Sequence, residues 1–369
     1  MIRLEMKKTK IIATLGPNSE DRETIEKMMR AGVDVFRLNI KHNQLVWHKM
    51  VLELIRKTEE KTGMKVSVMV DIEKIRDWKK IRGADLIALS NVKQAREIEK
   101  LKRIIGKTKN RIAVVAKIET REAIVNIDKI IAVSDGIMIA RGDLGKALPL
   151  TELAYWQKVI IDKCRGANVP VIVATEMLLS MVESLRPSRA EATDVANGVF
   201  DGTDGLMLSE ETTIGKHPVE TVEQMVRIVE FCEGKSDFVK KKGNKTGADE
   251  TEILIKAAVD VVELGDKKIK AVVLFTESGK TARIMSSFRM SLPILAVSNK
   301  RTTTSRLNIS YGIIPYFGEF DGGRFDIENP FFENLRKDGY FKTGDKVMVI
   351  HGNNWLNSGS TSSISIKTV

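Results

Sequence analysis

Two short apolar runs in the middle of the chain end in charged residues whose types could hold a divalent metal ion. Residues 112–116 stop at Lys117 and Glu119, and one repeat later residues 136–140 lead to Asp143. Because strand side chains alternate, Lys117 and Glu119 leave the strand end on the same side. Mg²⁺ usually takes one or two protein carboxylates and fills its shell with water and substrate oxygens. We therefore expect Glu119 and Asp143 to hold a metal beside Lys117, and the alternative is a structural ion pair at a strand end.

Polar residues close the neighbouring apolar runs as well, and together they could bind an anionic substrate. These residues are Arg37, Asn39, Asp71, Ser90, Arg141, Thr175, Glu176, Ser209, Glu210 and Glu211. A purely structural network rarely gathers several cations and carboxylates at one mouth. Arg37 would bind a phosphate or a carboxylate, and Lys117 would neutralise charge that develops on a transferred phosphoryl group or an enolate.

Eight apolar segments must position these side chains, and each is followed by a helical pattern or a turn. They begin near residues 10, 33, 66, 85, 112, 135, 170 and 204. Runs that are apolar throughout, rather than alternating, suit parallel strands buried on both faces. Eight strand–helix repeats in about 230 residues predict a TIM-type (β/α)₈ barrel with its active site at the strand ends. An open doubly wound sheet is the alternative, and it would rarely need eight strands.

A polar stretch rich in glycine and lysine divides the chain after the barrel. We predict a catalytic barrel at 1–235, a linker at 236–250 and a smaller three-layer α/β domain at 251–369. The expected elements of the second domain are a helix at 253–264, a strand at 269–275, a helix at 279–288, a strand at 293–297, a further helix and strand, and strands at 345–352 and 363–367.

Composition excludes several classes of protein. The 369 residues are 43% hydrophobic and 30% charged, as in ordinary globular proteins, and we expect neither a membrane span nor a signal peptide. Cys164 and Cys232 stand far apart, which indicates reduced thiols and a cytoplasmic location. The net charge of +11 comes with only 5% aromatic residues, so we expect attraction for anionic substrates and no nucleic-acid partner.

Long motifs make the chain resemble the pyruvate kinase family over nearly its whole length. The motifs are residues 9–17 (TKIIATLGP), 37–39 (RLN), 116–119 (AKIE), 134–145 (SDGIMIARGDLG), 174–178 (ATEML), 186–191 (RPSRAE) and 194–197 (DVAN). The resemblance implies a homo-oligomer, a dimer or a tetramer, that acts on phosphoenolpyruvate or pyruvate, with ADP or ATP as the nucleotide.

The resemblance also implies roles for individual residues. Lys117 would be the catalytic lysine, and Glu119 and Asp143 would bind Mg²⁺, with Mn²⁺ as an alternative. Arg37 would contact the phosphate, Asn39 would lie in the substrate site, and Thr175 would belong to the network that protonates the enolate. The substrate carboxylate would meet the backbone of Ala140, Arg141 and Gly142, and Arg76 would contribute to cofactor binding.

Departures from the family pattern concern the lid and the potassium site. The family inserts a mobile lid domain after the third strand, and the passage from Asp71 to Asp85 leaves no room for one. In the monovalent-cation region, formed by Asn39, residue 41 and Asp71, Lys41 replaces a serine. Its ammonium could supply the charge of the monovalent ion, so we expect that K⁺ is not required. The alternative is that Lys41 turns to solvent.

Further replacements at the mouth leave the substrate open. Glu176 stands for a glutamine, Glu210 for a glycine, and Lys146 and Ala147 for a valine and a glutamate. The leading prediction is phosphoryl transfer from phosphoenolpyruvate to ADP. The alternatives are Mg²⁺-dependent enolpyruvate chemistry without a nucleotide, as in a 2-oxo acid decarboxylase or aldolase, and a non-catalytic regulatory homologue.

A loop in the second domain resembles the effector loop of the family. Its residues are Thr276, Ser278, Gly279, Lys280 and Thr281, where a strand passes into a helix. Free N–H groups, hydroxyls and a lysine at a helix start suit a bound phosphate. A plain capped turn explains the same residues.

Overall fold

The structure is a computed structural model that describes residues 7–106, 112–235, 249–264, 268–318, 330–352 and 361–369. The chain divides into two compact units, one of Thr9–Lys240 and one of Met1–Lys8 with Lys241–Val369. The predicted linker, residues 236–250, lies almost wholly outside the described residues, and its limits stay a prediction.

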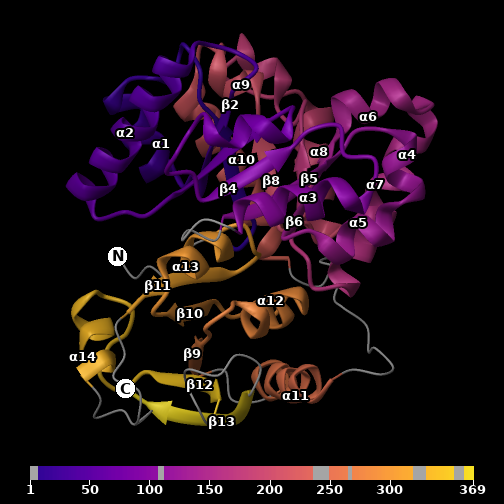
Figure 1. The fold of residues 1–369 in the computed structure, drawn as a ribbon. Coiled ribbons are helices and arrows are strands. Elements are labelled where there is room, and N and C mark those ends of the chain that lie inside the picture. The colour runs from indigo at the N-terminus through magenta and orange to yellow at the C-terminus, as the bar shows by residue number, and fades with distance from the viewer. Residues whose placement is uncertain (1–6, 107–111, 236–248, 265–267, 319–329, 353–360) are drawn as a thin grey trace. The chain divides into compact units, whose positions relative to one another are not determined.

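The first unit is a closed barrel of eight parallel strands in sequence order, as the apolar runs predict (Figure 1). The strands are β1 (Lys10–Thr14), β2 (Val35–Asn39), β3 (Ser67–Ile72), β4 (Leu86–Leu89), β5 (Ala113–Ile118), β6 (Gly136–Ala140), β7 (Val171–Ala174) and β8 (Gly205–Leu208). Every strand residue except Asn39 is buried, which explains why the runs lack alternation. The alternative of an open sheet is wrong, because β1 pairs with β8 and closes the barrel.

Helices surround the barrel strands, and local signals in the sequence set their ends. Helix α1 (Arg22–Ala31) begins where the Asp21 carboxylate accepts a hydrogen bond from the N–H of Thr24, at 2.9 Å. It ends at Gly32, whose φ of 114° a side chain would disfavour. The other helices of this unit are α2 (Leu45–Thr62), η1 (Ile75–Lys79), α3 (Ala95–Ile105), α4 (Arg121–Val125), α5 (Ile127–Val133), α6 (Arg141–Ala147), α7 (Leu150–Gly166), η2 (Leu179–Val182), α8 (Arg189–Phe200), α9 (Glu210–Thr213) and α10 (Pro218–Glu233).

The connection between β3 and β4 is short. It is described completely, and the 3₁₀ helix η1 is its only helix. A lid domain is therefore absent from this connection, as the spacing from Asp71 to Asp85 predicts.

Four aspartates repeat the same contact at the base of the barrel, opposite the mouth. Each one precedes an even-numbered strand, and its carboxylate accepts a hydrogen bond from a backbone N–H of the preceding odd-numbered strand. The pairs are Asp34 with Ile11 (2.8 Å), Asp85 with Val68 (2.8 Å), Asp135 with Val114 (2.9 Å) and Asp204 with Val171 (3.0 Å). In each pair the aspartate N–H donates back to the carbonyl of the same partner, at 2.9 Å. These base aspartates join the strands two by two, a fourfold repeat that the sequence analysis did not identify.

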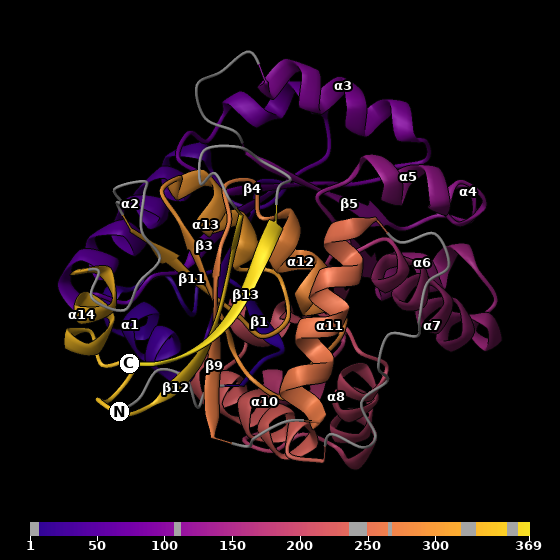
Figure 2. The ribbon, with the colours of Figure 1, turned by 90° about the horizontal axis from the view of Figure 1, so that it is seen from below.

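The second unit is a mixed α/β domain with three layers. Its sheet has the order β11-β10-β9-β12-β13, in which only β13 runs antiparallel to its neighbour. The strands are β9 (Ile269–Phe275), β10 (Ile294–Ser298), β11 (Ile313–Phe317), β12 (Lys346–Gly352) and β13 (Thr361–Thr368), and the helices are α11 (Glu250–Leu264), α12 (Lys280–Ser287), α13 (Arg301–Leu307) and α14 (Pro330–Lys337). Helices α11 and α12 pack on one face of the sheet and α14 on the other (Figure 2).

The start of this domain's first helix and the state of the two cysteines can be compared with what the sequence predicts. The first helix of this domain begins three residues earlier than predicted, because the Asp249 carboxylate accepts a hydrogen bond from the N–H of Glu252, at 2.8 Å. Cys164 and Cys232 are both free and buried, and burial raises the pKa of the Cys164 thiol. No helix in the described part of the chain is long and apolar enough to cross a membrane.

Candidate active site at the barrel mouth

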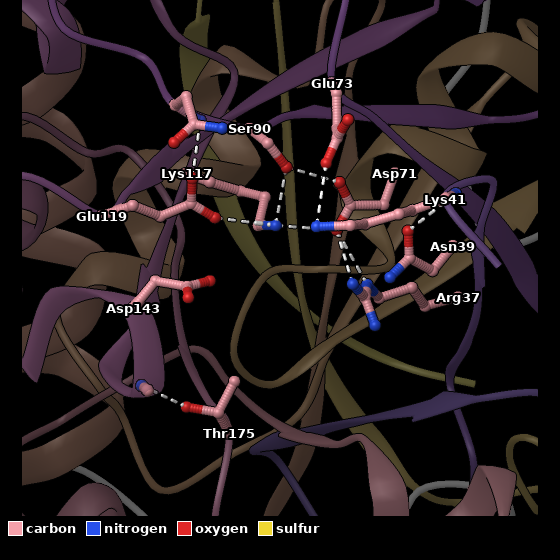
Figure 3. Close-up of polar contacts among 12 residues, drawn as sticks. Arg37, Asn39, Lys41, Asp71, Glu73, Ser90, Lys117, Glu119, Asp143 and Thr175 are labelled. Carbon is pink, nitrogen blue, oxygen red and sulfur yellow. Dashed lines mark hydrogen bonds and ion pairs between the residues drawn. The ribbon is translucent and has the colours of Figure 1, made fainter. Parts of the chain in front are cut away.

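Asp71, at the end of β3, is the centre of a buried charge network (Figure 3). Its Oδ2 accepts hydrogen bonds from Arg37 Nε at 3.0 Å and Nη2 at 2.6 Å, and it lies 3.0 Å from Lys117 Nζ. Its Oδ1 accepts a hydrogen bond from Ser90 Oγ at 2.9 Å. Burial raises the pKa of Asp71, but the charges of Arg37 and Lys117 outweigh burial and hold that pKa below its usual value. Asp71 is therefore a carboxylate at neutral pH.

Lys117 is held from three sides by the ends of β3, β4 and β5. Besides Asp71, its ammonium lies 2.8 Å from Glu119 Oε1 and donates to Ser90 Oγ at 2.8 Å. The other oxygen of Glu119 accepts a hydrogen bond from the N–H of Asn91 at 2.6 Å. Lys117 and Glu119 thus lie side by side, as strand alternation predicts, and the ion pair proposed as the alternative to a metal site is present.

Arg37 is held by Asp71 and Thr14, and part of its guanidinium is available to a ligand. Its Nη1 donates to Thr14 Oγ1 at 3.1 Å, and Thr14 in turn donates to the carbonyl of Leu208 at 2.8 Å. With two further donors on Asp71, contacts within the described part of the chain use three of the five N–H groups of the guanidinium, and the other two could bind an anion. Thr14, which ends β1 at the same mouth, was not among the site residues predicted from the sequence.

Asp143 lies in the first turn of α6 and is 59% exposed, with Lys146 at 3.2 Å. Figure 3 shows its carboxylate at the same mouth as Glu119. Within the described ranges, no group of three or more histidines, cysteines and carboxylates could hold a metal by itself. Two carboxylates that leave most positions to water and substrate oxygens fit Mg²⁺, and they do not fit a metal enclosed by protein ligands alone.

Lys41 lies at the exposed rim of the mouth. Its side chain is 61% exposed, and its ammonium pairs with Glu73 at 3.1 Å, while its backbone N–H donates to the side chain of Asn39. The pKa of Lys41 is raised chiefly by Glu73 and further by the charges of Asp143 and Glu119. Lys41 is therefore exposed to solvent, as the alternative to a cation-site role states. Its charge nevertheless interacts with both candidate metal ligands, Glu119 and Asp143. Arg76, on η1, is also exposed.

The end of β7 has an unusual backbone. Thr175 and Glu176 have φ angles of 74° and 54°, and we call these two residues the β7 elbow. Thr175 Oγ1 accepts a hydrogen bond from the N–H of Gly142 at 2.8 Å, so Thr175 lies against the start of α6 where the substrate carboxylate is expected.

The side chain of Arg141 contacts the β7 elbow rather than the open mouth. Its Nη2 donates to the carbonyls of Thr175 at 2.8 Å and Glu176 at 3.3 Å, and its Nη1 pairs with Asp194 of α8 at 2.6 Å. From the sequence, Arg141 was expected among the polar residues that face the mouth, with a specific role for its backbone; its side chain instead makes these contacts with the β7 elbow and α8. Asp194 was quoted within a motif, without a role of its own.

In the second domain, the loop at Thr276–Thr281 forms a capped turn. Gly279 has a φ of 81°, and its N–H donates to Thr276 Oγ1 at 3.0 Å. Lys280 pairs with Asp249 at 2.8 Å, the N–H of Lys280 approaches Ser278 Oγ at 3.4 Å, and Thr281 bonds Thr361 through their hydroxyls at 3.0 Å. These contacts account for the loop without a ligand, and its role as an effector site stays a prediction.

Family models match both units of the chain. The barrel domain of pyruvate kinase matches residues 6–77 and 73–222, and the alpha/beta domain of pyruvate kinase matches residues 252–367. This chain belongs to the pyruvate kinase family. The resemblance inferred from the motifs is thereby confirmed.

Three relatives illustrate the similarity, at 29–34% identity. The pyruvate kinase of Sporosarcina psychrophila is 29% identical over 476 residues, which cover 99% of this chain and 81% of the relative. That of Thermococcus litoralis is 30% identical and covers 95% of this chain and 96% of the relative. That of Clostridium acetobutylicum is 34% identical over 77% of this chain and 61% of the relative. The first alignment is more than a hundred positions longer than this chain of 369 residues, which agrees with the missing lid.

Proposed function

We propose that this protein transfers a phosphoryl group from phosphoenolpyruvate to ADP and so forms pyruvate and ATP. The proposal rests on the position of Lys117 between two buried carboxylates, Asp71 and Glu119, at the mouth of a pyruvate kinase family barrel. Beside it, Arg37 has two N–H donors that no described residue uses. Phosphoryl transfer depends mainly on positioning and on neutralising charge, and this network supplies both.

The chain's own residues have distinct tasks in this reaction. The two free donors of Arg37 would bind the phosphate, and the Lys117 ammonium would stay beside the phosphoryl group as the bond to the enolate oxygen breaks and the bond to the ADP oxygen forms. Glu119 and Asp143 would hold a Mg²⁺ ion, which supplies positive charge to the phosphate and enolate oxygens. Thr175 would take part in delivering a proton to the methylene carbon of the enolate, which gives pyruvate.

A coupled assay with phosphoenolpyruvate, ADP and Mg²⁺ tests the proposal. We expect ATP and pyruvate from the native protein and at least a 1000-fold lower rate from Lys117→Ala, since the charge that it supplies is worth several kcal/mol. Lys57→Ala is the matched control, because Lys57 is 61% exposed in a surface ion pair on α2. If the native protein makes no more pyruvate than Lys117→Ala, the proposal is wrong.

The missing lid supports a second candidate, enolpyruvate chemistry without a nucleotide. The lid excludes water and closes over the nucleotide in this family, and nothing in the short β3–β4 connection replaces its size. The same charge network would then stabilise the enolate of pyruvate during decarboxylation or aldol cleavage of a 2-oxo acid. Calorimetric titration with Mg-ADP separates the two candidates, because tight binding would contradict the second.

A further inference from the structure

The β7 elbow holds two side chains in a backbone conformation that they resist. A β-branched residue such as Thr175 at a φ of 74° is a genuine outlier, and Glu176 follows at 54°. Such a conformation is strained and persists only when the surroundings of the residue impose it. Some neighbouring group must therefore hold the elbow.

The guanidinium of Arg141 makes the contacts that impose this conformation. It donates to the carbonyls of both elbow residues, at 2.8 and 3.3 Å, and it lies 2.9 Å from Sδ of the next residue, Met177. These contacts are made by Nη2, while Nη1 pairs with Asp194, so the planar guanidinium joins α8 to the elbow in one fixed geometry, which the single nitrogen of a lysine cannot do.

Asp194 in turn orients Arg141. The Arg141 side chain is only 10% exposed, and the Asp194 carboxylate neutralises it at 2.6 Å from α8. Because Arg141 leaves the end of β6, the chain of contacts runs from α8 through Arg141 to the end of β7. It ends at the hydroxyl of Thr175, which accepts the N–H of Gly142 at 2.8 Å.

We propose that Arg141, oriented by Asp194, is a positioning residue that holds the β7 elbow and thereby sets the place of the Thr175 hydroxyl. The catalytic consequence rests on the proposed function, in which Thr175 takes part in protonating the enolate. Arg141 itself does not touch the phosphate-binding donors of Arg37, which lie on β2. Its loss therefore slows proton delivery and leaves the donors of Arg37 in place, so kcat should fall by a larger factor than KM for phosphoenolpyruvate rises.

Exchange of the methyl hydrogens of pyruvate with D₂O, followed by NMR with Mg²⁺ and inorganic phosphate, isolates the protonation step in reverse. We expect Arg141→Met to lose about 100-fold in this rate, the effect of misplacing a reacting group by about 1 Å. Arg141→Lys and Asp194→Asn should lose less. The matched control is Arg121→Met, because Arg121 is 61% exposed in a surface ion pair and should exchange at the native rate.

A rescue experiment distinguishes positioning from general damage. Glycine accepts a positive φ without cost, so adding Glu176→Gly to Arg141→Met should restore exchange at least about fivefold. Adding Glu176→Ala removes the same carboxylate but keeps a Cβ, and it should restore nothing. Equal rates in the two double variants would contradict the proposal.

Crystal structures of the variants give a readout that needs no activity. We expect Thr175 to leave the positive φ region in Arg141→Met and to keep it in the native protein. A native protein that exchanges pyruvate hydrogens but makes no ATP would overturn the proposed kinase function and leave this inference standing. An Arg141→Met variant with an unchanged elbow in the crystal, or with native exchange, would overturn the inference.

Discussion

Replacing Asp71 by asparagine tests whether the buried charge network holds the mouth together. The substitution keeps the shape of the side chain but removes the one carboxylate, among the residues that the structure describes, that contacts both Arg37 and Lys117. Arg37, whose side chain is 8% exposed, has no other carboxylate within the described contacts, whereas Lys117 keeps Glu119.

The expected cost follows from the burial of these groups. Breaking a buried ion pair by removing one partner costs about 3–5 kcal/mol, because the remaining charge stays desolvated and uncompensated. Since Lys117 keeps one carboxylate, we expect the lower end, about 3 kcal/mol. In a domain of about 150–250 residues each kcal/mol shifts Tm by about 2–4 °C, so the barrel should melt about 6–12 °C lower.

Thermal unfolding of the full chain measures this shift, with Asp128→Asn as the control. Asp128 also pairs with a lysine, but its side chain is 72% exposed, so its loss should cost less than about 1 kcal/mol. Sulfate should raise the Tm of Asp71→Asn more than that of the native protein, because the uncompensated cations bind an anion. A shift no larger than that of Asp128→Asn, with no added response to sulfate, would refute the reasoning.

Three other predictions concern the rim, a helix cap and the metal. Activity in potassium-free and sodium-free buffer should equal activity with K⁺ at matched ionic strength, because Lys41 brings a fixed positive charge near the mouth. Lys41→Ser should create a dependence on K⁺. Strong stimulation of the native protein by K⁺ would contradict this prediction. Burial raises the pKa of Glu191, but hydrogen bonds from Ser180 and Ser188 outweigh burial and hold that pKa below its usual value, so Glu191→Ala should cost about 1–2 kcal/mol at neutral pH in chemical denaturation. The difference should begin to shrink as the pH falls below 4.5, where the unfolded carboxylate takes up a proton, and it should vanish below the lowered pKa of the native carboxylate. Asp143→Ala should raise the Mg²⁺ concentration for half-maximal rate at least about tenfold in a metal titration, and an unchanged titration would exclude Asp143 as a ligand.

The barrel could be predicted from the sequence because its strands are buried on both faces. Their runs are apolar without interruption, and the polar residue that ends each run marks the mouth. For the same reason Lys117 and Glu119 could be placed together, since a strand fixes which neighbours share a side. The contact of Arg141 with Asp194 could not be predicted, because it joins the end of β6 to α8, and no pattern in the sequence specifies how these two elements meet.

Lys41 shows where the rule of alternation stops. Strand alternation was expected to continue from β2 through residue 41, but the strand ends at Asn39, and Lys41 lies 61% exposed at the rim, paired with Glu73. The base aspartates were overlooked for a different reason. Their signal, an aspartate just before every second strand, is present in the sequence, but its meaning depends on a backbone partner that sequence patterns do not specify.

The base aspartates also make the barrel tolerant of large genetic changes at the opposite end. Asp85 joins β3 to β4 through its two hydrogen bonds with Val68, below the strands, whatever chain connects them above. The register of these two strands therefore does not depend on the length of that connection. We therefore expect that a domain inserted into the β3–β4 connection, or removed from it, leaves Asp71 and Ser90 in place at the mouth. The barrel should therefore keep the same strand geometry with or without a lid domain.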